Sequence, residues 1–196
     1  SLTYHLVDIG QPQPTGTLTA QLRHIDAGVT LEKADATVTL LKSRQSSALA
    51  IARVDLAVRD AALRTHYVQG EVSYQTARTT AQVTTLEIET PDGRWRLAHP
   101  TQIMQENAGV SVERLLMTKG TEQIQLAGRA TLSGPQDFHL HLRRVALASL
   151  RTFWSPQPDI SGLLTVDAHI AGTAVAPRLT STLDVTGLRV AGQDYA

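Results

Sequence analysis

Aliphatic side chains recur at every second position through the second half of the chain. Leu164, Val166 and Ala168 are an example, because the residues between them are polar. Successive side chains of a β-strand point to opposite faces of the sheet, so this spacing predicts strands with one apolar and one polar face. The same alternation recurs within residues 122–132, 138–143 and 179–185. The chain is therefore predicted to be all-β.

Turn-forming residues separate these segments at short intervals. Pro91-Asp92-Gly93 predicts a tight turn, since proline presets the first turn position and glycine adopts positive φ. Many short strands divided by such turns are typical of antiparallel sheets built from hairpins. The apolar positions slip out of phase between Val83 and Leu86, which predicts a β-bulge there.

Residues 145–154 break the two-residue period. Leu147, Leu150 and an aromatic residue at 153 or 154 have helical spacing, and Ser155-Pro156 would end a helix. We expect one short helix near 145–154, at one end of the sheet. A bent strand followed by an aromatic plug fits the same residues.

Composition narrows the classes of function. The chain has 196 residues, a formal net charge of +0 and no cysteine. A neutral chain lacks the basic face expected of a nucleic-acid-binding protein, so no nucleic-acid partner is predicted. No run approaches the roughly 20 apolar residues that span a bilayer. Because the chain begins at Ser1, we expect residues 1–196 to be a fragment of a longer β-groove protein, with sub-units 1–90 and 91–196.

Two histidines raise the question of a metal site. His139 and His141 would share a strand face, and that geometry can hold a metal ion. The sequence fixes no third ligand for them, so a solvated outer face is the simpler interpretation. Asp167 and His169 could orient one another, but the chain has no nucleophile elbow of the Gly-x-Ser-x-Gly type. No metal and no cofactor are predicted.

Two carboxylates also share a predicted strand face. Glu87 and Glu89 could serve a glycosidase, which places its two carboxyl groups roughly 5–10 Å apart. Acidic residues on an exposed strand are far more common than such a site. Together with the absence of phosphate-binding, zinc-protease and calcium-loop motifs, this predicts that the chain is not an enzyme and has no catalytic residue.

The apolar face is the best candidate for function. Two amphipathic sheets could close on each other as a sandwich. Alternatively, an open, curved antiparallel sheet would present an apolar concave face as a groove, and such a face suits an apolar guest. The residues expected to line the groove are Ile124, Leu126, Leu132, Phe138, Leu140, Leu142, Leu164, Val166, Ile170, Leu179, Leu183 and Val185.

Residues 159–190 resemble a repeated phrase of the TamB family. Gly162 opens an alternating strand, and Gly172-Thr173 leads through a short turn to Pro177 and a second strand. Residues 93–100 and 124–128 are also similar in style to TamB chains. The resemblance covers the chain from Glu87 to its end, whereas the first third resembles the family only in its general sequence pattern.

The resemblance implies a fold, a place and a function. TamB-like and broader AsmA-like proteins are long envelope proteins of diderm bacteria, anchored in the inner membrane and extending across the periplasm. Their repeats form a taco-shaped β groove, and members are implicated in moving phospholipid between the membranes. TamB itself assists outer-membrane protein assembly with a β-barrel partner. The chain is thus expected to be a periplasmic segment that carries lipid acyl chains, with such a barrel as a partner of the full-length protein.

Two other functions remain open. The chain could be a periplasmic chaperone or scaffold whose sheet edge templates incoming β-strands during outer-membrane protein assembly. It could instead be a plain β-sandwich binding module. Unpaired strand edges also predict that the fragment forms an edge-to-edge dimer.

Overall fold

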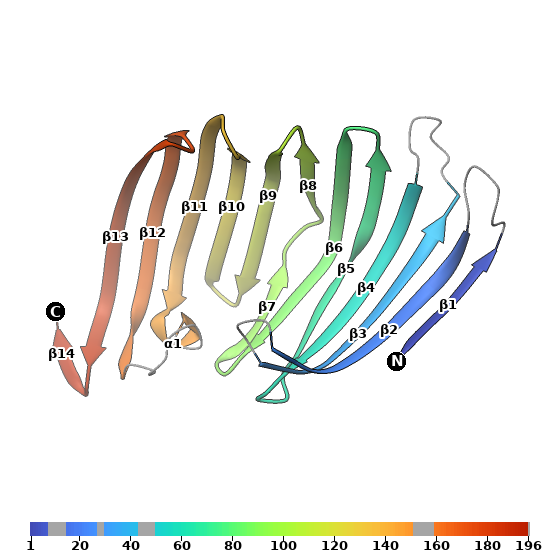
Figure 1. The fold of residues 1–196 in the computed structure, drawn as a ribbon. Coiled ribbons are helices and arrows are strands. Elements are labelled where there is room, and N and C mark those ends of the chain that lie inside the picture. Colours follow the sequence, from blue (N-terminus) through green and yellow to red (C-terminus); the bar gives the residue numbers. More distant parts are fainter. Residues whose placement is uncertain (8–14, 27–29, 43–49, 151–158, 196) are drawn as a thin grey trace. The chain divides into compact units, whose positions relative to one another are not determined.

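The computed structural model in Figure 1 describes residues 1–7, 15–26, 30–42, 50–150 and 159–195. Nearly all of them lie in antiparallel β-strands, which confirms the predicted all-β class. The chain divides into two compact units. Unit 1 contains residues 1–89 and 100–107, and unit 2 contains residues 90–99 and 108–196.

Unit 1 is an open antiparallel sheet. Its strands follow the chain order from β1 to β6, and β8 pairs with β6. The strands are β1 (Leu2–Val7), β2 (Thr15–Asp26), β3 (Thr30–Leu41), β4 (Ala50–Asp60), β5 (Thr65–Gln75), β6 (Arg78–Thr90, whose last residue belongs to unit 2) and β8 (Thr101–Glu106).

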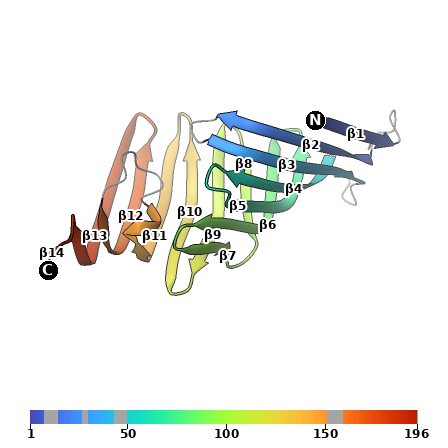
Figure 2. The ribbon, with the colours of Figure 1, turned by 90° about the horizontal axis from the view of Figure 1, so that it is seen from below.

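Unit 2 is likewise an open antiparallel sheet, in the order β7-β9-β10-β11-β12-β13-β14. Figures 1 and 2 show β10 to β13 side by side in one layer. Its elements are β7 (Gly93–Leu97), β9 (Gly109–Lys119), β10 (Glu122–Thr131), β11 (Pro135–Ala146), α1 (Leu147–Leu150), β12 (Ile160–Thr173), β13 (Ala176–Val190) and β14 (Gln193–Tyr195).

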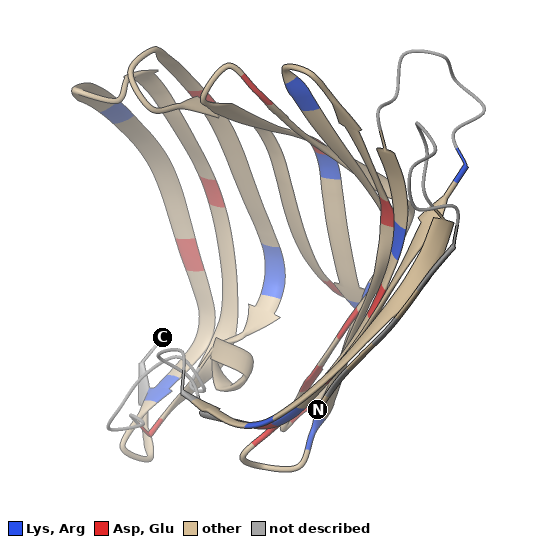
Figure 3. Ribbon diagram, turned by 45° about the vertical axis from the view of Figure 1, so that its right-hand side comes forward, with Lys and Arg blue, Asp and Glu red and all other residues tan. Residues whose placement is uncertain are grey.

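Bulges interrupt the strand pairing where the apolar period slips. In β6, Thr85 pairs with Gln69 and Val83 with Gly70, so Thr84 is the extra residue of the bulge predicted between Val83 and Leu86. The predicted turn at 91–93 is also present, between β6 and β7. Bulges bend and twist a strand, and the strands in Figure 3 are bowed.

The predicted short helix is α1, which confirms helix over bent strand for residues 147–150. It packs against β11 and β12 and buries Leu147 and Ser149. Residues 151–158, including the predicted stop at Ser155-Pro156, lie outside the described residues. In the part of the chain that the structure describes, no helix has the length and apolarity needed to cross a membrane.

Few hydrophobic side chains are buried. Among the described residues they are Ala34, Trp95, Val112, Met117, Val145, Leu147 and Leu164. All but Ala34 belong to unit 2. Within each unit the described strands form one layer, with no second sheet packed on it, so neither unit is a closed sandwich. A single layer leaves most side chains covered on one side at most, which explains the small core.

Candidate functional site

Strand register gathers the aliphatic residues of unit 2 onto one face, called here the apolar face. Directly paired residues of antiparallel strands lie on the same face of the sheet. The pairs join into transverse rows that cross β9 to β13. These rows are Met117–Ile124–Leu142–Val166–Leu183, Leu115–Leu126–Leu140–Ala168, Gly128–Phe138–Ile170–Leu179 and Val145–Leu164–Val185.

The apolar face contains all the residues that the sequence predicts for the groove lining except Leu132. Leu132 lies one residue beyond the end of β10 and is 81% exposed, so it is not part of the rows. Gly128 stands opposite Phe138, where a Cβ atom would come within 2.0 Å of the Asp137 carbonyl oxygen. Glycine is therefore required at that point of the face.

Three large members of the apolar face were not predicted, and the small Gly128 and Ala168 of its rows are not in the predicted lining either. Leu115 and Met117 come from β9, and Val145 comes from β11. Val145 joins the face because of a bulge between Leu142 and Val145, where Arg144 has a φ of 51°. Strict alternation from Leu142 would have placed residues 144 and 146 on this face instead. The signal for Val145 was the pair of arginines at 143 and 144, which marks a phase slip.

One end of the apolar face is covered, and we call it the closed end. It consists of five side chains with exposed fractions of 0–9%: Trp95, Met117, Val145, Leu147 and Leu164. Leu147 belongs to α1, which packs against β11 and β12. Trp95, with an exposed fraction of 3%, is a packing anchor of this end. The closed end holds all the buried hydrophobic side chains described for unit 2 except Val112.

A polar cluster adjoins the closed end. The Lys119 ammonium contacts the Asp92 carboxylate, lies 3.0 Å from Glu122 Oε1 and donates to Ser149 Oγ at 2.7 Å. The same ammonium lies 5.3 Å from the centroid of the Trp95 ring. Burial opposes ionisation of Asp92, but hydrogen bonds from Lys119 and Ser149 outweigh it and lower the pKa of Asp92. The cluster thus satisfies the charges that the closed end partly removes from water.

The opposite situation holds along β12 and β13, where the apolar face is uncovered. This open margin consists of Ile170, Leu179 and Leu183, which are 42%, 68% and 68% exposed. Among the described residues, β14 pairs only with 188–190 of β13, so no further strand borders the rest of β13. Three large aliphatic side chains therefore face water together.

The other face of unit 2 is polar, and it holds the predicted histidine pair. His139 stacks on His169 of β12, with ring centroids 3.9 Å apart, whereas His141 Nδ1 lies 3.4 Å from Asp167 Oδ2. Asp167 and His169, which the sequence suggested could orient one another, each interact with a residue of β11 instead. The register explains this, because it pairs His139 with His169 and His141 with Asp167.

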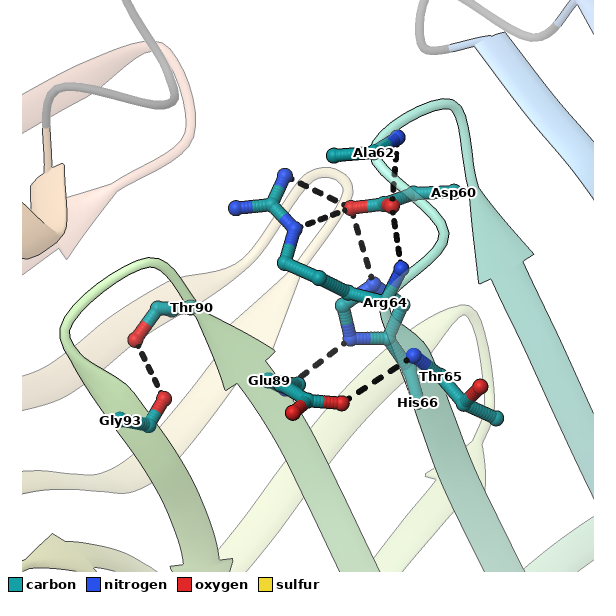
Figure 4. Close-up of polar contacts among 8 residues, drawn as sticks. All are labelled: Asp60, Ala62, Arg64, Thr65, His66, Glu89, Thr90 and Gly93. Atoms are coloured by element: carbon teal, nitrogen blue, oxygen red, sulfur yellow. Dashed lines mark hydrogen bonds and ion pairs between the residues drawn. The ribbon is translucent and has the colours of Figure 1, made fainter.

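Glu89 of unit 1 is one of the two carboxylates that the sequence places on one strand face. It takes part in a hydrogen-bond network that stabilises a turn (Figure 4). Its Oε2 accepts from the Thr65 backbone N–H at 3.3 Å, and its own N–H donates to His66 Nδ1 at 3.2 Å. Asp60 accepts from the Arg64 side chain at 2.7 Å. Burial opposes ionisation of Asp60, but the hydrogen bonds from Arg64 prevail and lower its pKa. Glu89 thus links the end of β6 to the start of β5 through hydrogen bonds.

Unit 1 also has a hollow of about 920 Å³ that the sequence does not predict. It opens on the polar face of β3 to β6 and β8, where Arg53, Glu71 and Gln82 form one row. Arg53 Nη2 donates to Glu71 Oε1 at 3.0 Å. The hollow is lined mainly by polar side chains, so it is distinct in character from the apolar face of unit 2.

Comparisons with known proteins find no matching family model, no matching curated protein and no matching solved structure. The resemblance to TamB therefore stays a prediction.

Proposed function

We propose that the apolar face of unit 2 binds lipid acyl chains. The observation that supports this proposal most directly is the open margin, where Leu179 and Leu183 are each 68% exposed beside Ile170. Large aliphatic side chains that face water on one surface usually mark a site that binds something apolar. On β13, Ser181 lies between Leu179 and Leu183 on this face. The rows behind the margin extend this surface across three further strands, β9 to β11, so a hydrocarbon chain could lie along it.

An apolar face without specific polar contacts suits movement of an acyl chain along it better than tight, specific binding of one lipid. Burial of a methylene contributes about 0.8 kcal/mol and has no preferred direction, so an acyl chain could slide between rows. The closed end limits that movement, because α1 and Trp95 already occupy the face there. A phosphate head group would remain in water at the open margin.

The proposed role of the whole protein follows the family resemblance. In it, the chain is a periplasmic segment of an inner-membrane-anchored protein of a diderm bacterium. That protein moves phospholipid between the two membranes or assists outer-membrane assembly with a β-barrel partner. The apolar face of unit 2 supplies one stretch of the lipid path.

The test compares two adjacent residues on opposite faces of β13. Leu179→Asp places a charge on the open margin, whereas Thr180→Asp places it on the polar face. Both sites are exposed, so both variants should keep the circular dichroism spectrum of the wild type. We expect native mass spectrometry to detect co-purified phospholipid on the wild type and on Thr180→Asp. On Leu179→Asp, the fraction of protein that carries phospholipid should be lower by about tenfold or more.

Equal phospholipid on the two variants, or none on the wild type after detergent-free purification, would contradict the proposal. A fluorescent phospholipid titrated against all three proteins gives an independent measure of the same difference.

A second function has its own support. From residue 176 to 187, β13 is bordered by no further strand among the described residues. Such an edge presents unpaired backbone groups that can accept a strand from another chain, as a templating chaperone or an edge-to-edge dimer requires. In that case the wild type should self-associate in sedimentation velocity, and Leu179→Asp should do so equally, because the substitution leaves the backbone edge intact.

A further inference from the structure

Three potential metal ligands converge on the polar face of unit 2. His169 Nε2 lies 2.8 Å from Asp137 Oδ1, and His139 Nε2 lies 3.3 Å from the same oxygen. The three ligand atoms all lie within 4.8 Å of one another. Asp137 and His139 come from β11 and His169 from β12, so the group joins two strands.

The strand register brings the group together. His139 and His169 are directly paired residues, and their rings stack with centroids 3.9 Å apart and planes 10° from parallel. Asp137 precedes His139 by two residues and therefore lies on the same face. The pairing of β11 with β12 is continuous from Pro135 to Leu142, so no bulge disturbs this part of the sheet.

The donor set and its spacing suit a transition-metal ion. Imidazole nitrogen and carboxylate oxygen are both ligands of Zn²⁺, at about 2.0–2.2 Å in tetrahedral sites. Bonds of that length place neighbouring donors roughly 3.3–3.5 Å apart. The 2.8 Å and 3.3 Å separations from Asp137 to the two histidines are close to this spacing. Ligation also requires the two stacked rings to turn out of their parallel arrangement, so that both nitrogens point at one ion.

We propose that Asp137, His139 and His169 bind one Zn²⁺ ion, with water as the fourth ligand. The side chains of the three residues are 68%, 57% and 39% exposed, so the ion can enter from solvent and water can reach it. Because the ligands come from two strands, the bound ion clamps β11 to β12. The proposal is independent of lipid binding, since the site lies on the opposite face of the sheet.

The neighbouring row provides a matched control. His141 lies on the same strand and the same face as His139, but its nearest acidic partner is Asp167, at 3.4 Å. It is not part of the converging group. His141→Ala removes one imidazole from the same surface and should leave the zinc site intact.

The experiment measures zinc binding by calorimetry on the untagged full chain, freed of metal by chelator and dialysis. We expect saturable binding of one ion per chain. His169→Ala and His139→Ala should each weaken it by at least about 10–100-fold, because the loss of a group that only supports a metal ligand already has an effect of that size. Asp137→Asn should weaken it as well, whereas His141→Ala should stay within about twofold of the wild type.

Thermal stability gives a second test, because a bound ion would hold β11 and β12 together. Zinc that binds the folded chain raises its melting temperature, and chelator should reverse the rise. The rise should be present in His141→Ala and absent from the His139→Ala/His169→Ala double variant. The proposal is overturned by a lack of saturable binding, by equal losses in His141→Ala and His169→Ala, or by full binding to the double variant. Circular dichroism of each apo variant checks that the exposed substitutions leave the sheet folded.

Discussion

Leu164 and Leu183 lie on the same face of unit 2, on neighbouring strands, yet one is 9% and the other 68% exposed. Leu164 pairs with Val145 on one side and Val185 on the other, and α1 packs against its strand. Leu183 pairs with Val166 on one side and has no strand on the other among the described residues. The closed end and the open margin thus differ in what covers them, while their side chains are of the same kind.

This difference teaches where stability and binding reside. Apolar area removed from water stabilises the fold by roughly 25 cal/mol per Å², so the closed end contributes to stability and the open margin contributes little. The area that the open margin leaves exposed is the area that a guest can bury. Single substitutions at the closed end and at the open margin can therefore test whether stability and binding depend on different parts of this face.

The largest expected effect comes from equal truncations at the two sites. Leu164→Ala should lower the free energy of unfolding by about 2–5 kcal/mol, because it leaves a cavity in the core. Leu183→Ala should change it by less than about 0.5 kcal/mol, as is usual for an exposed site. Urea denaturation followed by circular dichroism measures both. Similar losses in the two variants would show that the open margin is covered in solution.

A smaller effect is expected from the polar cluster of the closed end. Lys119→Met leaves the Asp92 and Glu122 carboxylates partly buried without their shared cation, and should cost about 1–3 kcal/mol of unfolding free energy.

Lys33→Met is the matched control for that change. Lys33 pairs with Asp35 at 2.7 Å in an exposed setting, so its loss should cost no more than about 1 kcal/mol. A Lys33→Met loss as large as that of Lys119→Met, in the same urea titration, would mean that burial does not strengthen the cluster.

The smallest expected effect is the response of the closed end to acid. The pKa of Asp92 is lower in the folded chain than its ordinary value of 3.8, so the unfolded chain binds more protons in this range. The stabilisation by Asp92 is therefore complete above about pH 4–5 and is lost as the pH falls through the folded-state pKa.

Fluorescence of Trp95, which lies 5.3 Å from the Lys119 ammonium, reports on this end in a Trp154→Phe background. Asp92→Asn should flatten the loss of stability in acid. Asp60→Asn changes a carboxylate of unit 1 whose pKa is also lowered, and should leave the signal from Trp95 unaltered. An identical acid response in Asp92→Asn and the wild type would exclude Asp92 as its source.

Local sequence patterns were sufficient for the elements and their faces. The two-residue alternation around Leu126, Leu140 and Val166 predicted which side chains share a face, because side-chain direction along a strand depends only on residue parity. The bulge between Val83 and Leu86 and the helix at 147–150 were visible for the same reason, since each is a local change of period.

Tertiary structure alone decided which of those side chains are covered and which polar groups meet. Val145 joins the face only because a bulge in β11 changes its parity, and Leu164 is buried only because α1 and β11 lie beside it. His169 reaches Asp137 across the register of β11 and β12, although residues 147–159 separate the two strands in the sequence. The parity of a residue is a property of its own strand, whereas burial and register depend on contacts between segments that are distant in sequence. The sequence therefore determined the apolar face. The tertiary structure determined its closed end, its open margin and the histidine group on the opposite face.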